Sequence, residues 1–204
     1  MGWLETNGIK LYYECHGQGE TIVFAHGAGG NHLSWWQQVP YFSRRYRCVT
    51  FDHRGFGRST DGEPSPGANA YPDDLRALLD HLGVDRAYLV AQSMGGGTCM
   101  GFTAAYPERV NALVMADTIG GISAPSLDET ARKTRESRPA ATLDTGAYHP
   151  ELQHERPELA FLYDSIRALN PPRPTPPAGS AAAREPRITA TADKLQAMKT
   201  PVLF

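Results

Sequence analysis

A serine between an apolar run and a group of glycines is the residue of this sequence best placed to do chemistry. Residues 90–97 read VAQSMGGG, so Ser93 ends a stretch with strand composition and precedes a glycine-rich helical stretch. This context fits the GxSxG pattern of a nucleophile elbow, with the small residue Ala91 in place of the first glycine. Ser93 is therefore the candidate nucleophile. The alternative is a serine that only caps the helix.

A second stretch complements the serine. Residues 24–30 read FAHGAGG and follow another apolar strand, so their flexible backbone can direct an N–H group to the same place. The N–H groups of Ala28 and Met94 would then form an oxyanion hole, in which each donor contributes roughly 3–4 kcal/mol to acyl transfer. Gly29 is the neighbouring alternative to Ala28. If Ser93 is not a nucleophile, Ala28 and Met94 are ordinary loop and helix residues.

The elements that must position these residues follow from periodicity. Strands are predicted where apolar runs end at a turn: residues 9–17, 21–27, 46–55, 85–93 and 110–118. Helices are predicted for residues 31–45 as far as Pro40, for 94–109, and for 72–83, where Leu75, Leu78, Leu79 and Leu82 share one face. Continuously apolar strands that alternate with helices indicate an α/β fold with a mostly parallel sheet covered on both faces.

The composition and the periodicity of the sequence change after residue 119. Residues 120–190 lose the strand signal, contain helix-like stretches such as DETARKTRES and ELAFLYDSIRAL, and include PPRPTPP at 171–177, which predicts an extended connector. Residues 191–204 then contain a short helical stretch and the start of an apolar strand. We therefore expect three parts: core residues 1–119, an insertion at 120–190, and the start of a C-terminal core part at 191–204.

The motifs HGAGG (26–30), FDHRGFGRS (51–59) and AQSMGG (91–96), in this order, resemble the α/β-hydrolase fold family. The resemblance implies a serine esterase, lactonase or related acyl hydrolase with no cofactor and no metal, and a helical cap at residues 120–190. It also implies that Asp52 and Arg54 hold a tight loop. Family members with an aspartate nucleophile, the dehalogenases and epoxide hydrolases, are excluded by the serine.

The catalytic acid and histidine are the difficulty. The resemblance implies the chain order serine, acid, histidine, with the acid after the strand that begins near residue 201 and the histidine on a later loop. We therefore expect both to follow Phe204. The candidates within the chain are Asp117, at the end of a strand, and His149 and His154, in the insertion.

Composition limits the partners. The 204 residues are 41% hydrophobic and 21% charged, with a net charge of -2 and a pI near 6.4, which gives no basic face for nucleic acid or an anionic membrane. No stretch approaches the roughly 18 apolar residues of a membrane span, and the N-terminus lacks a signal-like apolar region. Three widely separated cysteines favour reduced thiols. We expect a cytoplasmic protein with a small-molecule acyl substrate and possible self-association through an unpaired sheet edge.

Three other functions stay open. SMGGG also resembles the elbow of cofactor-free haloperoxidases and perhydrolases, which use the same triad with peroxide. Carbon–carbon bond hydrolases share the fold as well. The third alternative is a catalytically silent fragment or binding scaffold, which the missing histidine favours.

Overall fold

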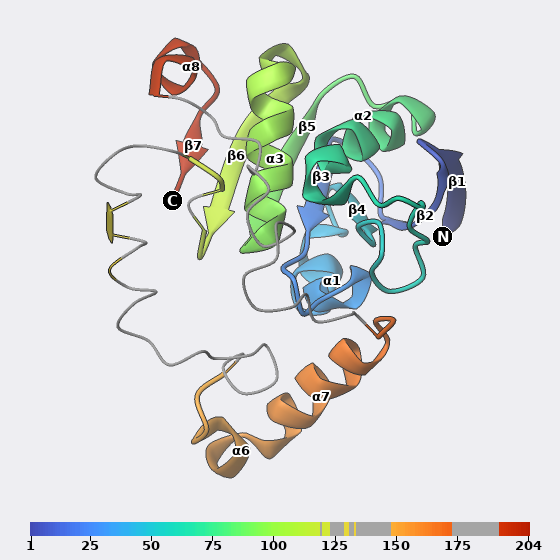
Figure 1. The fold of residues 1–204 in the computed structure, drawn as a ribbon, viewed down its shortest axis with the longest axis vertical. Helices are drawn as coiled ribbons and strands as arrows, with labels where there is room; N and C mark the ends of the chain where they lie inside the picture. Colours follow the sequence, from blue (N-terminus) through green and yellow to red (C-terminus); the bar gives the residue numbers. More distant parts are fainter. Residues whose placement is uncertain (119, 123–128, 131–132, 134–147, 173–191) are drawn as a thin grey trace.

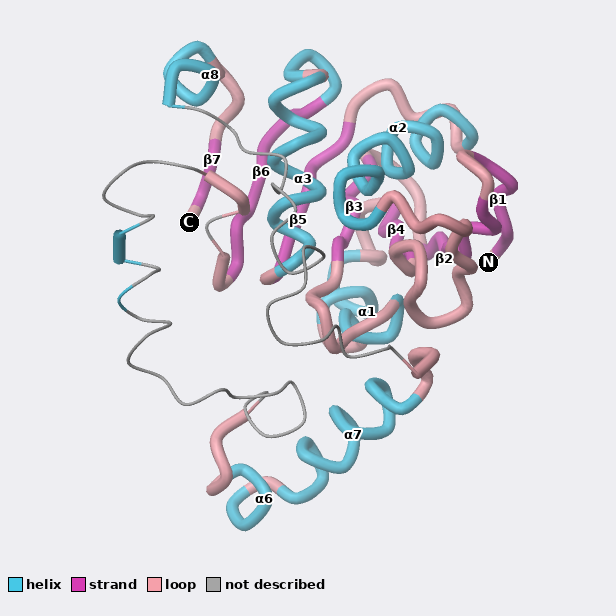
Figure 2. Tube along the Cα trace, in the orientation of Figure 1, coloured by secondary structure: helices cyan, strands magenta, loops and turns pink. Residues whose placement is uncertain are grey.

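The apolar runs form one seven-stranded sheet in the computed structural model, which describes residues 1–118, 120–122, 129–130, 133, 148–172 and 192–204. The strand order is β1-β2-β4-β3-β5-β6-β7 (Figures 1 and 2). The strands are β1 (Gly2–Thr6), β2 (Ile9–His16), β3 (Thr21–Ala25), β4 (Arg47–Phe51), β5 (Ala87–Gln92), β6 (Val110–Ala116) and β7 (Val202–Leu203).

The sheet is parallel except at its N-terminal edge. Strands β4, β3, β5, β6 and β7 pair in parallel, whereas β1 and β2 form an antiparallel hairpin and β2 pairs antiparallel with β4. The predicted mostly parallel α/β architecture is confirmed. β1 was not predicted from the sequence. It is short, and its residues alternate between half-buried and exposed, as expected of an edge strand with one face in solvent.

The helices occupy both faces of the sheet. They are η1 (His32–Trp35), α1 (Gln38–Phe42), η2 (Gly67–Ala70), α2 (Tyr71–His81), α3 (Met94–Ala105), η3 (Pro107–Arg109), α6 (Leu152–Glu155), α7 (Pro157–Ala168) and α8 (Ala192–Ala197). The prediction that Pro40 ends a helix is wrong. Pro40 lies within the first turn of α1, where a proline is tolerated because the N–H groups of that turn have no helical partner.

Alternate side chains of the strands point into two apolar clusters. Val23, Val49 and Leu89 belong to the larger cluster, which also contains the buried leucines of α2 and the side chains of Cys99, Met100 and Phe102 on α3. Ile22 and Cys48, one residue earlier on β3 and β4, belong to a smaller cluster with Trp35 of η1 and Phe42 of α1. Both faces of the central strands are therefore covered, which is why these strands read as continuous apolar runs.

Two of the three free cysteines serve as packing residues. Cys48 and Cys99 are fully buried, while Cys15 is half-buried. Burial raises the pKa of the Cys48 thiol to about 11 and that of Cys99 to about 12, because desolvation disfavours the thiolate. Both thiols are protonated at neutral pH and behave as small apolar side chains.

The segment predicted as an insertion is described only in part. Helices α6 and α7 lie together at the bottom of Figure 1, beyond the end of β6. Residues 173–177 of the proline-rich connector, and most of the helix-like stretch at 128–137, lie outside the described residues. None of the helices in the described ranges has the length and apolar character needed to cross a membrane.

Candidate active site

Ser93 occupies the sharp turn between β5 and α3. Its backbone has φ 50° and ψ -114°, a left-handed φ that a non-glycine residue adopts only when its surroundings impose it. The side chain is exposed and makes no capping hydrogen bond to α3. A helix cap has an extended backbone and an engaged side-chain oxygen, so the capping alternative does not describe Ser93.

Small residues allow the turn to form. A Cβ on Gly95 would collide with the backbone carbonyl oxygen of Ala25 at the end of β3. A Cβ on Gly27 would lie 3.1 Å from the Ser93 Cβ, and nearer still to the Gln92 side-chain oxygen. The helix and the loop after β3 therefore approach Ser93 more closely than larger residues permit. Ala91, which replaces the usual glycine, is fully buried in β5.

A cavity of about 690 Å³ opens where three parallel strands end. Its lining includes Ala28 after β3, Ser93 after β5 and Asp117 after β6. Side chains from the α6–α7 segment form another part of its wall: Tyr148, Leu152, Leu159, Leu162, Tyr163 and Ile166. The carboxyl ends of parallel strands are the usual ligand site of such sheets, and the serine singled out from the sequence lies in this position.

Two backbone N–H groups near the serine have no hydrogen-bond partner within the part of the chain that the structure describes. They belong to Ala28, which lines the cavity, and to Met94, the first residue of α3. The Met94 N–H is one of the first-turn donors that a helix leaves unpaired. The structure thus brings Ser93 and the two predicted oxyanion donors to the same region of the fold.

Asp117 shares two features with Ser93. It directly follows a parallel strand, and its φ of 52° is also left-handed. Its side chain is exposed and lines the same cavity. The carboxylate considered as an in-chain acid is therefore on the correct side of the sheet for that role.

The histidines are placed less favourably. All seven lie within the described residues, and His26 is the one that lines the cavity. Its Nδ1 lies 2.7 Å from the Gly27 carbonyl oxygen, and its Nε2 accepts the His53 N–H at 3.1 Å, so both ring nitrogens are engaged. The in-chain candidates His149 and His154 are exposed and do not line the cavity.

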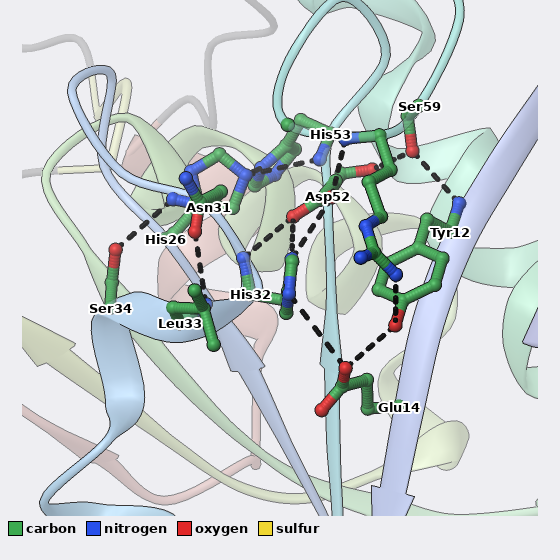
Figure 3. Close-up of polar contacts among 12 residues, drawn as sticks. Tyr12, Glu14, His26, Asn31, His32, Leu33, Ser34, Asp52, His53 and Ser59 are labelled. Carbon is green, nitrogen blue, oxygen red and sulfur yellow. Dashed lines mark hydrogen bonds and ion pairs between the residues drawn. The ribbon is translucent and has the colours of Figure 1, made fainter. Parts of the chain in front are cut away.

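Asp52, a buried residue of the motif FDHRGFGRS, fixes the conformation of this turn through hydrogen bonds to its carboxylate. Its buried carboxylate accepts the N–H of His32 at 2.6 Å and that of Arg58 at 2.8 Å, and also contacts the His32 ring at 2.9 Å (Figure 3). His32 begins η1, directly after the HGAGG loop. Asp52 therefore joins the turn after β4 to the segment after β3, part of which lines the cavity, in keeping with its expected structural role.

Two asparagines attach α7 to these turns. Asn31, which is fully buried, donates its Nδ2 to the carbonyl oxygen of Ile166 at 2.7 Å. Asn170 donates to the Gly29 carbonyl oxygen at 3.2 Å and accepts the Gly57 N–H at 2.8 Å. The α7 segment is thus bonded to the loop that carries Ala28 and to the residue after it, across 135 and 141 residues of sequence.

Replacing Asn31 by alanine is expected to lower the free energy of unfolding by about 1–3 kcal/mol, because the Ile166 carbonyl and the Leu33 N–H both lose their side-chain partner. Amide hydrogen exchange within α7 should accelerate as its attachment weakens. Urea denaturation and exchange mass spectrometry measure the two effects. Asn111→Ala, at a half-buried position on β6, is the control. Unchanged exchange in α7 would contradict the attachment.

Sequence reasoning missed the aromatic residues of the cavity wall. Tyr163 lies so close to the loop after β3 that a Cβ on Gly29 would be 2.6 Å from its hydroxyl. Burial raises the pKa of this hydroxyl, so it stays protonated at neutral pH. A signal was present: Leu159, Leu162, Tyr163 and Ile166 follow the i, i+3, i+4, i+7 spacing of one helix face.

A family model described as the alpha/beta hydrolase fold matches residues 20–182. The chain belongs to this family. The resemblance inferred from the three sequence motifs is therefore confirmed. The mixed sheet and the left-handed serine turn agree with this family assignment.

Individual relatives cover a range of named activities. RutD of Caulobacter sp. (strain K31), a candidate carbamate hydrolase, is 32% identical over 78% of this chain and 59% of its own length. Epoxide hydrolase 2 of Siraitia grosvenorii is 38% identical over 54% of this chain and 36% of its own length. The chain thus spans less than two thirds of either relative. Among solved structures, Est816, described as an N-acyl homoserine lactone degrading enzyme, is 26% identical with a TM-score of 0.72, over 98% of this chain and 79% of that one.

Proposed function

We propose that this chain carries the nucleophile and the oxyanion hole of a serine hydrolase that acts on a small ester, lactone or related acyl compound. The observation that carries the proposal is the exposed Ser93 on its left-handed turn, in one cavity with the N–H of Ala28, which has no partner among the described residues. The named relatives RutD and Est816 support the substrate class, since carbamates and lactones both react at a carbonyl group.

The proposed reaction proceeds through an acyl-enzyme. The Ser93 hydroxyl oxygen bonds to the substrate carbonyl carbon, its proton passes to a base, and the carbonyl π electrons move onto oxygen. The N–H groups of Ala28 and Met94 stabilise that negative oxygen. The leaving oxygen then departs with the proton from the base, and water repeats the sequence to release the acid.

The base is proposed to come from a segment that follows Phe204 in a longer protein, together with the acid. Both nitrogens of His26 are engaged in hydrogen bonds, and the remaining six histidines do not line the cavity. Loss of a catalytic histidine costs on the order of 10⁶ in turnover in a serine protease. Ester turnover by residues 1–204 alone is therefore expected to be very slow.

The cavity wall formed by α6 and α7 is proposed to contact the part of the substrate that does not react. The side chains of Leu152, Leu159, Leu162 and Ile166 are apolar, and each methylene group buried against them contributes about 0.8 kcal/mol. We propose that residues 120–190 act as a cap over the cavity, and that the acyl or alcohol portion of the substrate that contacts α6 and α7 is apolar.

Labelling with a fluorophosphonate tests the proposal, because this reagent forms a covalent phosphonyl ester with a nucleophilic serine. At pH 9, where hydroxide can take the place of the missing base, we expect one adduct per chain after long incubation, located on Ser93 by peptide mass spectrometry and lost completely in Ser93→Ala. Ser165→Ala, which removes an exposed hydroxyl on α7, is the control and should label like the wild type. Labelling that persists in Ser93→Ala would overturn the proposal.

The pH dependence of the same reaction locates the base. If no base within residues 1–204 serves Ser93, the labelling rate should rise about tenfold per pH unit between pH 6 and pH 9, as expected for a hydroxyl ionised by hydroxide. A plateau near neutral pH would show instead that a group within the chain accepts the proton, with Asp117, His149 and His154 as the variants to test.

A further inference from the structure

The direction of each proposed oxyanion donor is set by a carbonyl group. The Ala28 N–H belongs to the peptide unit whose carbonyl is that of Gly27, and the Met94 N–H belongs to the unit whose carbonyl is that of Ser93. Both peptide bonds are trans. In a planar trans peptide the N–H and C=O bonds point in opposite directions. Whatever holds the carbonyl oxygen therefore determines where the N–H points.

The Gly27 carbonyl oxygen is held by two donors. It accepts the Gly30 N–H at 3.0 Å and lies 2.7 Å from Nδ1 of His26. Because a carbonyl oxygen can only accept, the Nδ1 atom carries a proton. The other nitrogen, Nε2, accepts the backbone N–H of His53 at 3.1 Å, which is the arrangement of a neutral ring in one tautomer.

The His26 ring is fixed by its surroundings. It is fully buried and stands edge-on to the His53 ring at a centroid distance of 4.4 Å. Figure 3 shows the contact between the two histidines. The far nitrogen of His53 lies 2.8 Å from the Thr98 hydroxyl on α3. This chain of buried contacts, from α3 through two rings to the Gly27 carbonyl, holds the His26 ring in one orientation.

The Ser93 carbonyl oxygen is held in the same way. It accepts the Gly96 N–H at 2.9 Å and the Thr118 hydroxyl at 2.8 Å. The Thr118 oxygen itself accepts the Gly120 N–H at 3.0 Å, so its own proton is directed to Ser93. Each carbonyl thus receives one backbone N–H from three residues further along the chain and one side-chain donor.

We propose that His26 and Thr118 are positioning residues that fix the two peptide planes and so keep the Ala28 and Met94 N–H groups directed at one point in the cavity. The inference rests on the proposed function and adds two side chains to it. Donors that are already oriented need no reorganisation when negative charge develops, which is the source of most oxyanion stabilisation.

Thr118 gives the sharper test, because it can be altered with little change in shape. Thr118→Val removes the hydroxyl, and Thr118→Ser keeps it. Thr103→Val is the matched control, because it removes a threonine-to-carbonyl hydrogen bond of 2.7 Å, to Cys99, within α3, the helix that begins at Met94. The second-order rate of fluorophosphonate labelling at Ser93 should fall about tenfold in Thr118→Val, less than the loss of a whole donor, and stay within about threefold of wild type in Thr118→Ser and Thr103→Val.

A second measurement does not depend on chemistry at Ser93. The ¹⁵N chemical shift of the Met94 amide responds to hydrogen bonding at the Ser93 carbonyl, because the two groups form one conjugated unit. It should move in Thr118→Val and return in Thr118→Ser. For the other donor, the Ala28 shift should move in His26→Leu and recover in His26→Asn, whose amide nitrogen occupies the position of Nδ1.

The outcomes separate the two proposals. If the wild type does not label at Ser93 even at pH 9, where hydroxide can take the place of the missing base, the proposed function fails. The Met94 and Ala28 shifts still decide whether the side chains orient these amides. If the wild type labels and Thr118→Val labels equally fast with an unmoved Met94 shift, the positioning role is overturned and the proposed function stands.

Discussion

Replacing Asp74 by alanine is expected to lower the free energy of unfolding by about 3–5 kcal/mol, because it leaves a buried guanidinium without its counter-charge. The Arg54 and Asp74 side chains are each 2% exposed. Nε and Nη2 of Arg54 donate to the two carboxylate oxygens at 2.7 Å each, and Asn7 donates to one of them at 2.9 Å. Hydrogen bonding to Asp74 raises the pKa of Arg54 although burial opposes it, so the charge persists.

Asp73 provides the control for this variant. Both aspartates lie in the first turn of α2, so each interacts favourably with the helix dipole. The Asp73 side chain is 62% exposed and its ion pair with Arg76 is 3.9 Å long, which is worth less than about 1 kcal/mol. Urea denaturation of Asp73→Ala and Asp74→Ala should therefore differ by several kcal/mol. Equal losses would mean that the dipole, and not the buried pair, accounts for Asp74.

The double variant Arg54→Met, Asp74→Leu separates the charge from the packing. A buried ion pair replaced by apolar side chains of similar volume is often neutral in stability, since two desolvation costs disappear with the attraction. This variant should thus be more stable than Asp74→Ala. If it is equally unstable, the hydrogen bonds that Asp74 accepts from Arg54 and Asn7, and not the unpaired charge, account for the loss.

Local signals in the sequence were sufficient for the central sheet and for the serine turn. β3 is buried throughout and β5 is buried or half-buried throughout, so both produce continuous apolar runs, and the glycines after Ser93 indicate close packing before any contact is known. β1 escaped prediction because an edge strand of five residues with one exposed face has little apolar excess. The catalytic role of Ser93 stays a prediction.

Long-range contacts explain what the sequence did not reveal about the site. The spacing of the apolar residues in α7 predicts its apolar face. No local pattern in the sequence indicates that this face packs near the loop after β3. The bonds of Asn31 and Asn170 cross 135 and 141 residues, and asparagine is common in loops for other reasons. The hydroxyl of Thr118 bonds to the Ser93 carbonyl only because β5 and β6 end side by side.

Substituting alanine for Gly95 and for Gly97 is expected to change stability in opposite directions. Gly95→Ala places a methyl group 2.7 Å from the Ala25 carbonyl carbon, and nearer still to its oxygen, on a backbone segment of β3 that cannot move independently. Overpacking of this kind costs about 1–3 kcal/mol. At Gly97 the described part of the chain places no atom within 4 Å of the added methyl group, apart from the neighbouring residues and the backbone of α3 itself. The same substitution there raises helix propensity and should stabilise the protein by up to about 1 kcal/mol.

The comparison distinguishes propensity from packing, because both glycines lie within the first turns of α3 and carry the same intrinsic penalty in a helix. Thermal and urea denaturation measure the difference in stability, and fluorophosphonate labelling measures its effect on the serine. Gly95→Ala should also slow labelling, since moving α3 away from β3 displaces the turn that holds Ser93. Gly97→Ala should label at the wild-type rate. If both variants gain stability, α3 does not need its close approach to β3, and the small residues around Ser93 have another cause.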